Sequence, residues 1–150
     1  MKIILLFFLI TGFSFLKYDT NKAVEYARKY CSIYNKNTYF DFEHGDAANF
    51  VSQCMIAGGM DFKDCLGVVE KYGVIPSVAN LRVCLTTKGF KSSKTLVKNF
   101  KAGYPIAFGN SHIVIASKIT GSHVYYCCHT IDRCDFHLNY SGKDLTYYYL

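Results

Sequence analysis

Apolar residues recur at helical spacing in the N-terminal half of the chain. After Asp19 or Thr20, either of which can cap a helix, apolar positions at i, i+3, i+4 and i+7 predict an amphipathic helix ending near residue 31. A second helix is predicted over Ala47–Ala57, with Asp46 as its N-cap and two glycines after its last turn.

Three further segments favour helices. One is predicted over residues 62–72, and Ser77 can cap another that runs to about Lys88 and stops at Gly89. Ser93 can cap a last one over residues 95–100.

The C-terminal third changes to β-branched and aromatic residues separated by Gly-Asn and Gly-Ser turns. These segments predict strands over residues 105–108, 112–117, 124–128 and 145–150. Helices that precede strands predict an α+β domain, in which the N-terminal helices pack on a C-terminal antiparallel sheet.

The first residues have the pattern of a secretory signal peptide. Lys2 precedes an apolar run over residues 3–10, and small residues follow, with cleavage expected after Ser14. A membrane anchor would need about 20 apolar residues, more than this run offers, and a buried N-terminal helix is the other alternative. We therefore expect a signal peptide over 1–14, one domain over 15–150, and a secreted protein without a membrane anchor after cleavage.

Composition supports a folded domain that matures in an oxidising compartment. The 150 residues are 51% hydrophobic and 17% aromatic, which excludes a disordered chain. Seven cysteines indicate disulfides, whose connectivity the sequence leaves open. Their spacing fits no zinc motif, so we expect no metal.

The chain carries a net charge of +6, which favours anionic partners. The densest basic stretch, residues 88–101, contains five lysines but has no nucleic-acid recognition motif beside it. A solvated helix face explains it better. We expect no nucleic-acid partner.

Three segments contain residues suited to acyl-transfer chemistry: residues 45–54 (GDAANFVSQC), 111–115 (SHIVI) and 128–133 (CHTIDR). A thiol in the first turn of a helix has a lowered pKa, because unpaired N–H groups and the helix dipole favour the thiolate. The same N–H groups can hold an oxyanion. Position 47 is such a site, but it is occupied by Ala47.

These segments resemble the amidase-domain family, a branch of the papain-like cysteine hydrolases related to NlpC and CHAP domains. In that family a Gly-Asp-Cys-Thr/Ala-Asn-Phe-Val-Ser-Gln block opens the helix that bears the nucleophile, and Ala47 stands at the cysteine. The resemblance extends over most of the mature chain, through residues 18–19, 26–27, 57–59, 103–108 and 129–133.

A histidine should act as the base, and His112 is the best candidate because it begins an apolar strand. His112, Val114 and Ala116 share one strand face, so a helix packed there would bring position 47 opposite the imidazole. The resemblance places His129 as the third, orienting member. Asp132 is the runner-up.

Other polar residues are candidates for substrate binding or have a structural explanation. Asp46 and Asn49 flank position 47, and Arg133 can either bind a substrate carboxylate in bidentate fashion or pair with Asp132. Cys54 lies two turns inside the helix, where the dipole has little effect, so it is expected in the core or in a disulfide.

The resemblance implies a secreted, monomeric cysteine amidase or endopeptidase that cleaves peptidoglycan peptides without a cofactor. The methyl group of Ala47 cannot form an acyl-enzyme, so the chain as written should not turn over. Either the catalytic cysteine has been replaced deliberately, which the intact surrounding motifs favour, or the protein is a natural pseudoenzyme that binds cell-wall peptides without cutting them.

Overall fold

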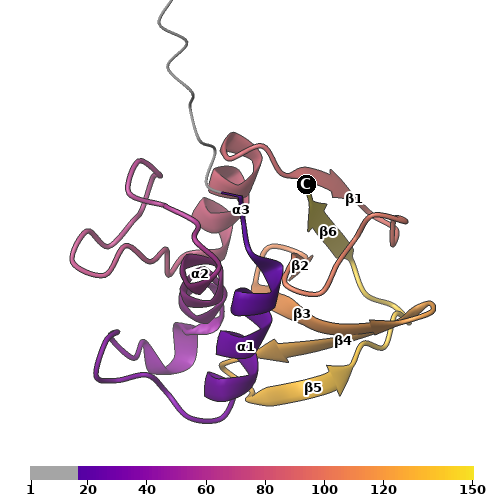
Figure 1. The fold of residues 1–150 in the computed structure, drawn as a ribbon, viewed down its shortest axis with the longest axis horizontal. Coiled ribbons are helices and arrows are strands. Elements are labelled where there is room, and N and C mark those ends of the chain that lie inside the picture. Colours follow the sequence, from indigo (N-terminus) through magenta and orange to yellow (C-terminus); the bar gives the residue numbers. More distant parts are fainter. Residues whose placement is uncertain (1–16) are drawn as a thin grey trace, which may run out of the picture.

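The computed structural model describes residues 17–150, so the predicted signal peptide lies outside the described part of the chain. The predicted α+β class is confirmed: three helices precede and cover one six-stranded antiparallel sheet (Figure 1). The helices and the short 3-10 turn are α1 (Thr20–Tyr30), η1 (Glu43–Gly45), α2 (Ala47–Ala57) and α3 (Val78–Thr87). The strands are β1 (Lys91–Ser93), β2 (Pro105–Phe108), β3 (His112–Thr120), β4 (His123–Cys128), β5 (Arg133–His137) and β6 (Leu145–Tyr149).

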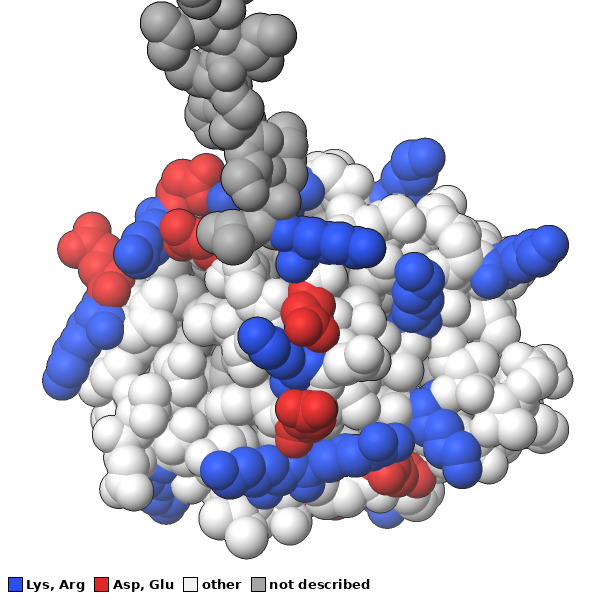
Figure 2. All heavy atoms as spheres, viewed as in Figure 1, with Lys and Arg blue, Asp and Glu red and all other residues white. Residues whose placement is uncertain are grey.

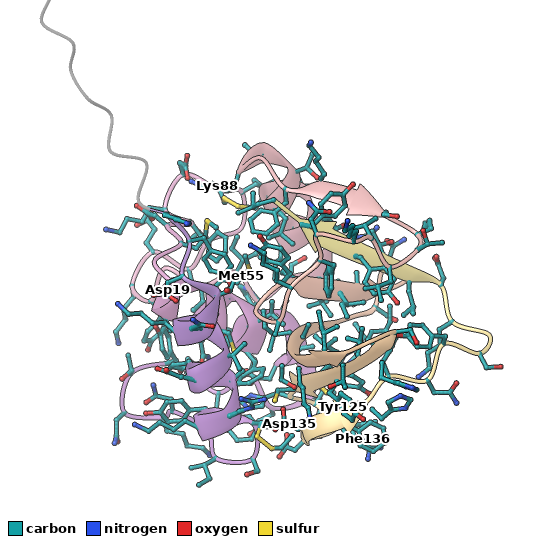
Figure 3. The ribbon with its side chains drawn as sticks, turned by 45° about the vertical axis from the view of Figure 1, so that its right-hand side comes forward. Asp19, Met55, Lys88, Tyr125, Asp135 and Phe136 are labelled. Carbon is teal, nitrogen blue, oxygen red and sulfur yellow. A yellow bond between two sulfur atoms is a disulfide. The ribbon has the colours of Figure 1, made fainter. Side chains whose placement is uncertain are left out.

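The helices begin where the sequence provides caps. The Asp19 carboxylate accepts a hydrogen bond from the backbone N–H of Lys22, and the Ser77 hydroxyl accepts one from Asn80. Helix α2 is buried along nearly its whole length, because its side chains contact other helices on one side and the sheet on the other. Figure 3 shows Met55 of α2 in this interior layer.

The sheet has the strand order β1-β6-β2-β3-β4-β5, and each neighbouring pair is antiparallel. Strands β2 and β3 pair in regular register from Pro105 opposite Ile115 to Phe108 opposite His112. An irregularity between Ala116 and Lys118 shifts the pairing of β3 with β4. The start of β3, where His112 lies, is therefore in a regular part of the sheet.

Two predicted helices are wrong, and two strands were not predicted. Residues 62–72 form turns held by the Cys65–Cys84 disulfide and by an isolated bridge between Val69 and Val74. Residues 95–100 form turns and no helix. Strands β1 and β5 are short and largely exposed, so they lack the apolar pattern that identifies a strand in a sequence.

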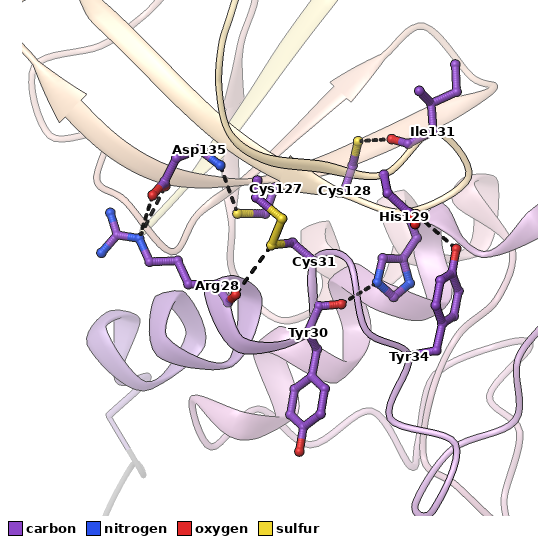
Figure 4. The surroundings of a disulfide bond; sticks show 11 residues. Arg28, Tyr30, Cys31, Tyr34, Cys127, Cys128, His129, Ile131 and Asp135 are labelled. Atoms are coloured by element: carbon purple, nitrogen blue, oxygen red, sulfur yellow. Dashed lines mark hydrogen bonds and ion pairs between the residues drawn. A yellow bond between two sulfur atoms is a disulfide. The ribbon is translucent and has the colours of Figure 1, made fainter.

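A second disulfide, Cys31–Cys134, joins the end of α1 to β5 (Figure 4). Two disulfides agree with folding in an oxidising compartment. Among residues 17–150, no helix is long and apolar enough to cross a membrane. On the face seen in Figure 2, basic side chains are scattered, with acidic ones between them.

Candidate functional site

Asp46 precedes α2 but does not cap it through its side chain. The predicted cap bond is absent, and the Oδ1 atom instead accepts hydrogen bonds from the Phe42 backbone N–H at 3.2 Å and from the Asn49 amide at 2.6 Å. The Oδ2 atom faces Nδ1 of His129 at 2.5 Å. Asp46 is only 1% exposed, so all these partners belong to the protein itself.

His129 has both of its ring nitrogens engaged within the protein. Nε2 donates to the backbone carbonyl of Tyr30 at 2.7 Å, as the close-up shows (Figure 4), while Nδ1 contacts Asp46. A carbonyl only accepts, so Nε2 must carry a proton. His129 therefore has no free nitrogen with which to orient a second imidazole.

Aromatic rings hold His129 on both faces. The Phe50 ring of α2 lies 3.8 Å from the imidazole by centroid distance, and the Tyr34 ring lies 4.1 Å away. The Tyr34 hydroxyl donates to Asp132 at 3.0 Å. Asp132 thus contacts the loop after α1. Tyr34 was not among the residues predicted from the sequence, because a lone tyrosine in a polar loop gives no pattern signal.

Ala47 lies at the start of α2, beside this buried group. Ala47 is only 5% exposed. The cavity next to Asp46 and His129 has a volume of only about 10 Å³, and its walls include Tyr34, Tyr39 and Phe40. A cavity of this size is at the lower limit for one water molecule. It offers no room for a peptide beside His129.

The strand register places His112 on the other face of the sheet from His129. His129, just after the end of β4, stacks on Phe50 of α2 and so points toward the helices. Cys127 faces them too, because it lies close enough to the buried Cys54 of α2 to help raise the pKa of that thiol. Ile115 pairs directly with Cys127 and therefore also faces the helices. His112 is three residues before Ile115, and an odd separation in a regular strand reverses the side-chain direction. The side chain of His112 therefore points away from the helices.

The observed contacts of His112 agree with this placement. Its ring centroid lies 5.7 Å from that of its strand partner Phe108, and Phe108 lies 5.8 Å from Tyr126. Burial lowers the pKa of His112, so the imidazole is neutral at neutral pH. The structure brings Asp46, Ala47 and His129 together, whereas the side chain of His112 lies on the other face of the sheet. The catalytic roles remain predictions.

The other candidate residues take structural positions. Asn49 is fully buried and donates to Asp46 and to the Phe40 carbonyl, while its own Oδ1 has no hydrogen-bond partner within the described residues. Arg133 is half-buried and lies over the Phe136 ring at 4.1 Å. Cys54 is an unpaired core cysteine, and burial raises the pKa of its thiol.

The N-terminal part of the chain is similar to one known protein family. Residues 17–68, which include α1 and α2, match the family model described as “Putative amidase domain”. This match covers about a third of the chain and includes position 47. No curated protein and no solved structure matches the chain.

Proposed function

We propose that this chain is an exported, non-hydrolysing protein built on an amidase-type domain, which binds the cell wall through its excess of basic side chains, and not in the closed site beside His129, without cleaving the wall peptides. The absence of hydrolysis is inferred from the residues at the start of α2. The nucleophile position holds Ala47, and both nitrogens of His129 bind Asp46 and the Tyr30 carbonyl. Without a nucleophile no acyl-enzyme forms.

Binding without hydrolysis is consistent with the rest of the molecule. The net charge of +6, or +5 once the predicted signal peptide with Lys2 is removed, favours anionic polymers such as peptidoglycan with free carboxylates. The two disulfides support export to a compartment where such polymers occur.

Co-sedimentation with purified peptidoglycan sacculi tests the proposal. We expect the protein to pellet with the sacculi, to be released by added salt, and to leave no soluble muropeptide fragments detectable by mass spectrometry. Release of fragments by the unaltered chain would contradict the proposal, and so would a failure to pellet at low salt.

A second candidate is a cysteine amidase whose nucleophile has been replaced in this chain. The family match favours it, because residues 17–68 include the segment around position 47. In that case Ala47→Cys restores hydrolysis, which incubation of that variant with muropeptides measures.

A further inference from the structure

A groove of about 570 Å³ lies between the β4–β5 strands, the segment around residue 95 and β6. Leu96, Leu145 and Tyr147 give it an apolar floor, and Lys94, Lys143 and the pair His123 and His137 contribute polar groups. Ligand pockets in proteins have volumes of about 300–1,000 Å³ and combine an apolar lining with a few polar groups. This groove has both properties.

The groove lies on the face of the sheet that points away from the helices. Tyr148 accepts a hydrogen bond from Arg82 of α3 at 2.7 Å, so its side chain points toward the helices. Tyr147, its neighbour in β6, therefore points the opposite way. The groove is thus separate from the Asp46–His129 site, and the inference below does not depend on the proposed function.

The rim of the groove has an uncompensated positive charge. Its acidic neighbour Asp144 is paired with Lys94 at 2.6 Å, which lowers the pKa of that carboxyl group. Lys143 forms no ion pair with any residue from 17 to 150, and its ammonium lies over the Phe108 ring at 5.3 Å. One free cation beside an apolar floor favours a ligand with one negative charge.

The remaining polar groups of the groove add no negative charge. Nδ1 of His123 and Nε2 of His137 lie 3.0 Å apart, so one imidazole donates to the other and each keeps its other ring nitrogen for a ligand or water. Burial raises the pKa of Tyr147 to about 12, and it also raises that of Tyr140. Both phenols therefore stay neutral.

From these observations we infer that the groove binds a small amphipathic monoanion, namely a carboxylate joined to an aliphatic chain. The aliphatic chain lies against Leu96, Leu145 and Tyr147, and the carboxylate lies at the rim near Lys143. A doubly charged phosphate would need a second free cation, but Lys94 is already paired with Asp144.

Calorimetric titration with dodecanoate, below its micelle concentration, tests the inference on the full folded protein. Dodecyltrimethylammonium is the matched cationic probe, and we expect it to bind at least about tenfold more weakly, since it has the same chain and the opposite charge. Ser122→Trp should abolish dodecanoate binding, because Ser122 is exposed at the groove and the indole fills it without altering the core.

Lys143→Gln should weaken dodecanoate binding by about tenfold, whereas Lys71→Gln should leave it unchanged. Lys71 is a matched control, because its ammonium also lies over an aromatic ring, at 5.0 Å from Tyr72, but outside this groove. Absence of dodecanoate binding would overturn the inference. Equal affinity for both probes, or full binding by the Ser122→Trp variant, would overturn it too.

Discussion

The imidazole of His129 and the carboxylate of Asp46 meet 2.5 Å apart in the interior, and each side chain is only 1% exposed. The pair joins the start of α2 to the end of β4, and the Tyr30 carbonyl connects it to α1. It therefore ties three elements together. We interpret the pair as a structural link between these elements.

His129→Phe should destabilise the protein by roughly 3–5 kcal/mol, because the phenyl ring can keep the stacking with Phe50 but leaves the buried Asp46 carboxylate without its partner. Urea denaturation of the purified protein measures this loss. A double-mutant cycle with Asp46→Asn should show strong coupling, since the two side chains are in contact. Simple additivity of the two single variants would contradict a direct link.

The stability of the protein should rise with pH in the range just below about 6.5, in part because of His112. Burial lowers the pKa of this residue in the folded state, so in that range the unfolded chain binds a proton that the folded chain does not. Protonation therefore favours unfolding as the pH falls. The free energy of unfolding of His112→Gln, measured by urea titration from pH 5 to 7, should depend less on pH than that of the parent. An equal or steeper slope in the variant would show that His112 is not desolvated.

Loss of the Cys31–Cys134 disulfide should cost more stability than loss of Cys65–Cys84. The sequence separations are 103 and 19 residues, and the loop-closure entropy of the unfolded chain predicts costs of about 4.7 and 3 kcal/mol. Thermal unfolding of the two double Cys→Ala variants compares them directly. The reverse order of melting temperatures would mean that native contacts, not loop length, decide these costs.

Gly103 should not tolerate a side chain. Its φ is +92°, and a Cβ atom there would lie 2.7 Å from the Thr20 carbonyl oxygen. Gly103→Ala should therefore destabilise the protein by more than the roughly 1 kcal/mol of backbone strain alone. Gly121→Ala is the matched control, because Gly121 also has a positive φ, of +60°, but a Cβ atom added there would have no neighbouring atom within 4 Å. Equal losses of stability in urea would rule out a steric conflict with Thr20.

The sequence predicted the regular elements well where local signals were strong. The α2 boundaries and the caps at Asp19 and Ser77 are confirmed, because periodicity and capping chemistry act within a few residues. The strands at 105–108 and 112–117 are likewise found. Strand β5 could not be predicted, since it forms by pairing with β4 while most of its residues stay exposed.

The site was less predictable than the fold, because it depends on which face of the sheet the helices cover. Strand alternation correctly groups His112 with Val114 and Ala116. It does not say whether this group or the alternate residues of the same strand face α2. The stacking of His129 on Phe50 supplies that information. The buried partners of Asp46 are similarly long-range, because His129 lies 83 residues further along the chain.

The central claim is that this site does not hydrolyse amides, and Ala47→Cys tests it most directly. The variant, its parent and the variant with His112→Ala are each incubated with muropeptides, and the products are followed by mass spectrometry with and without iodoacetamide. The parent controls for background alkylation, since its three free cysteines are all buried. We predict that Ala47→Cys folds but releases no product above the parent. Product release that is blocked by iodoacetamide and lost on adding His112→Ala would contradict the account and establish the chain as an amidase lacking only its thiol.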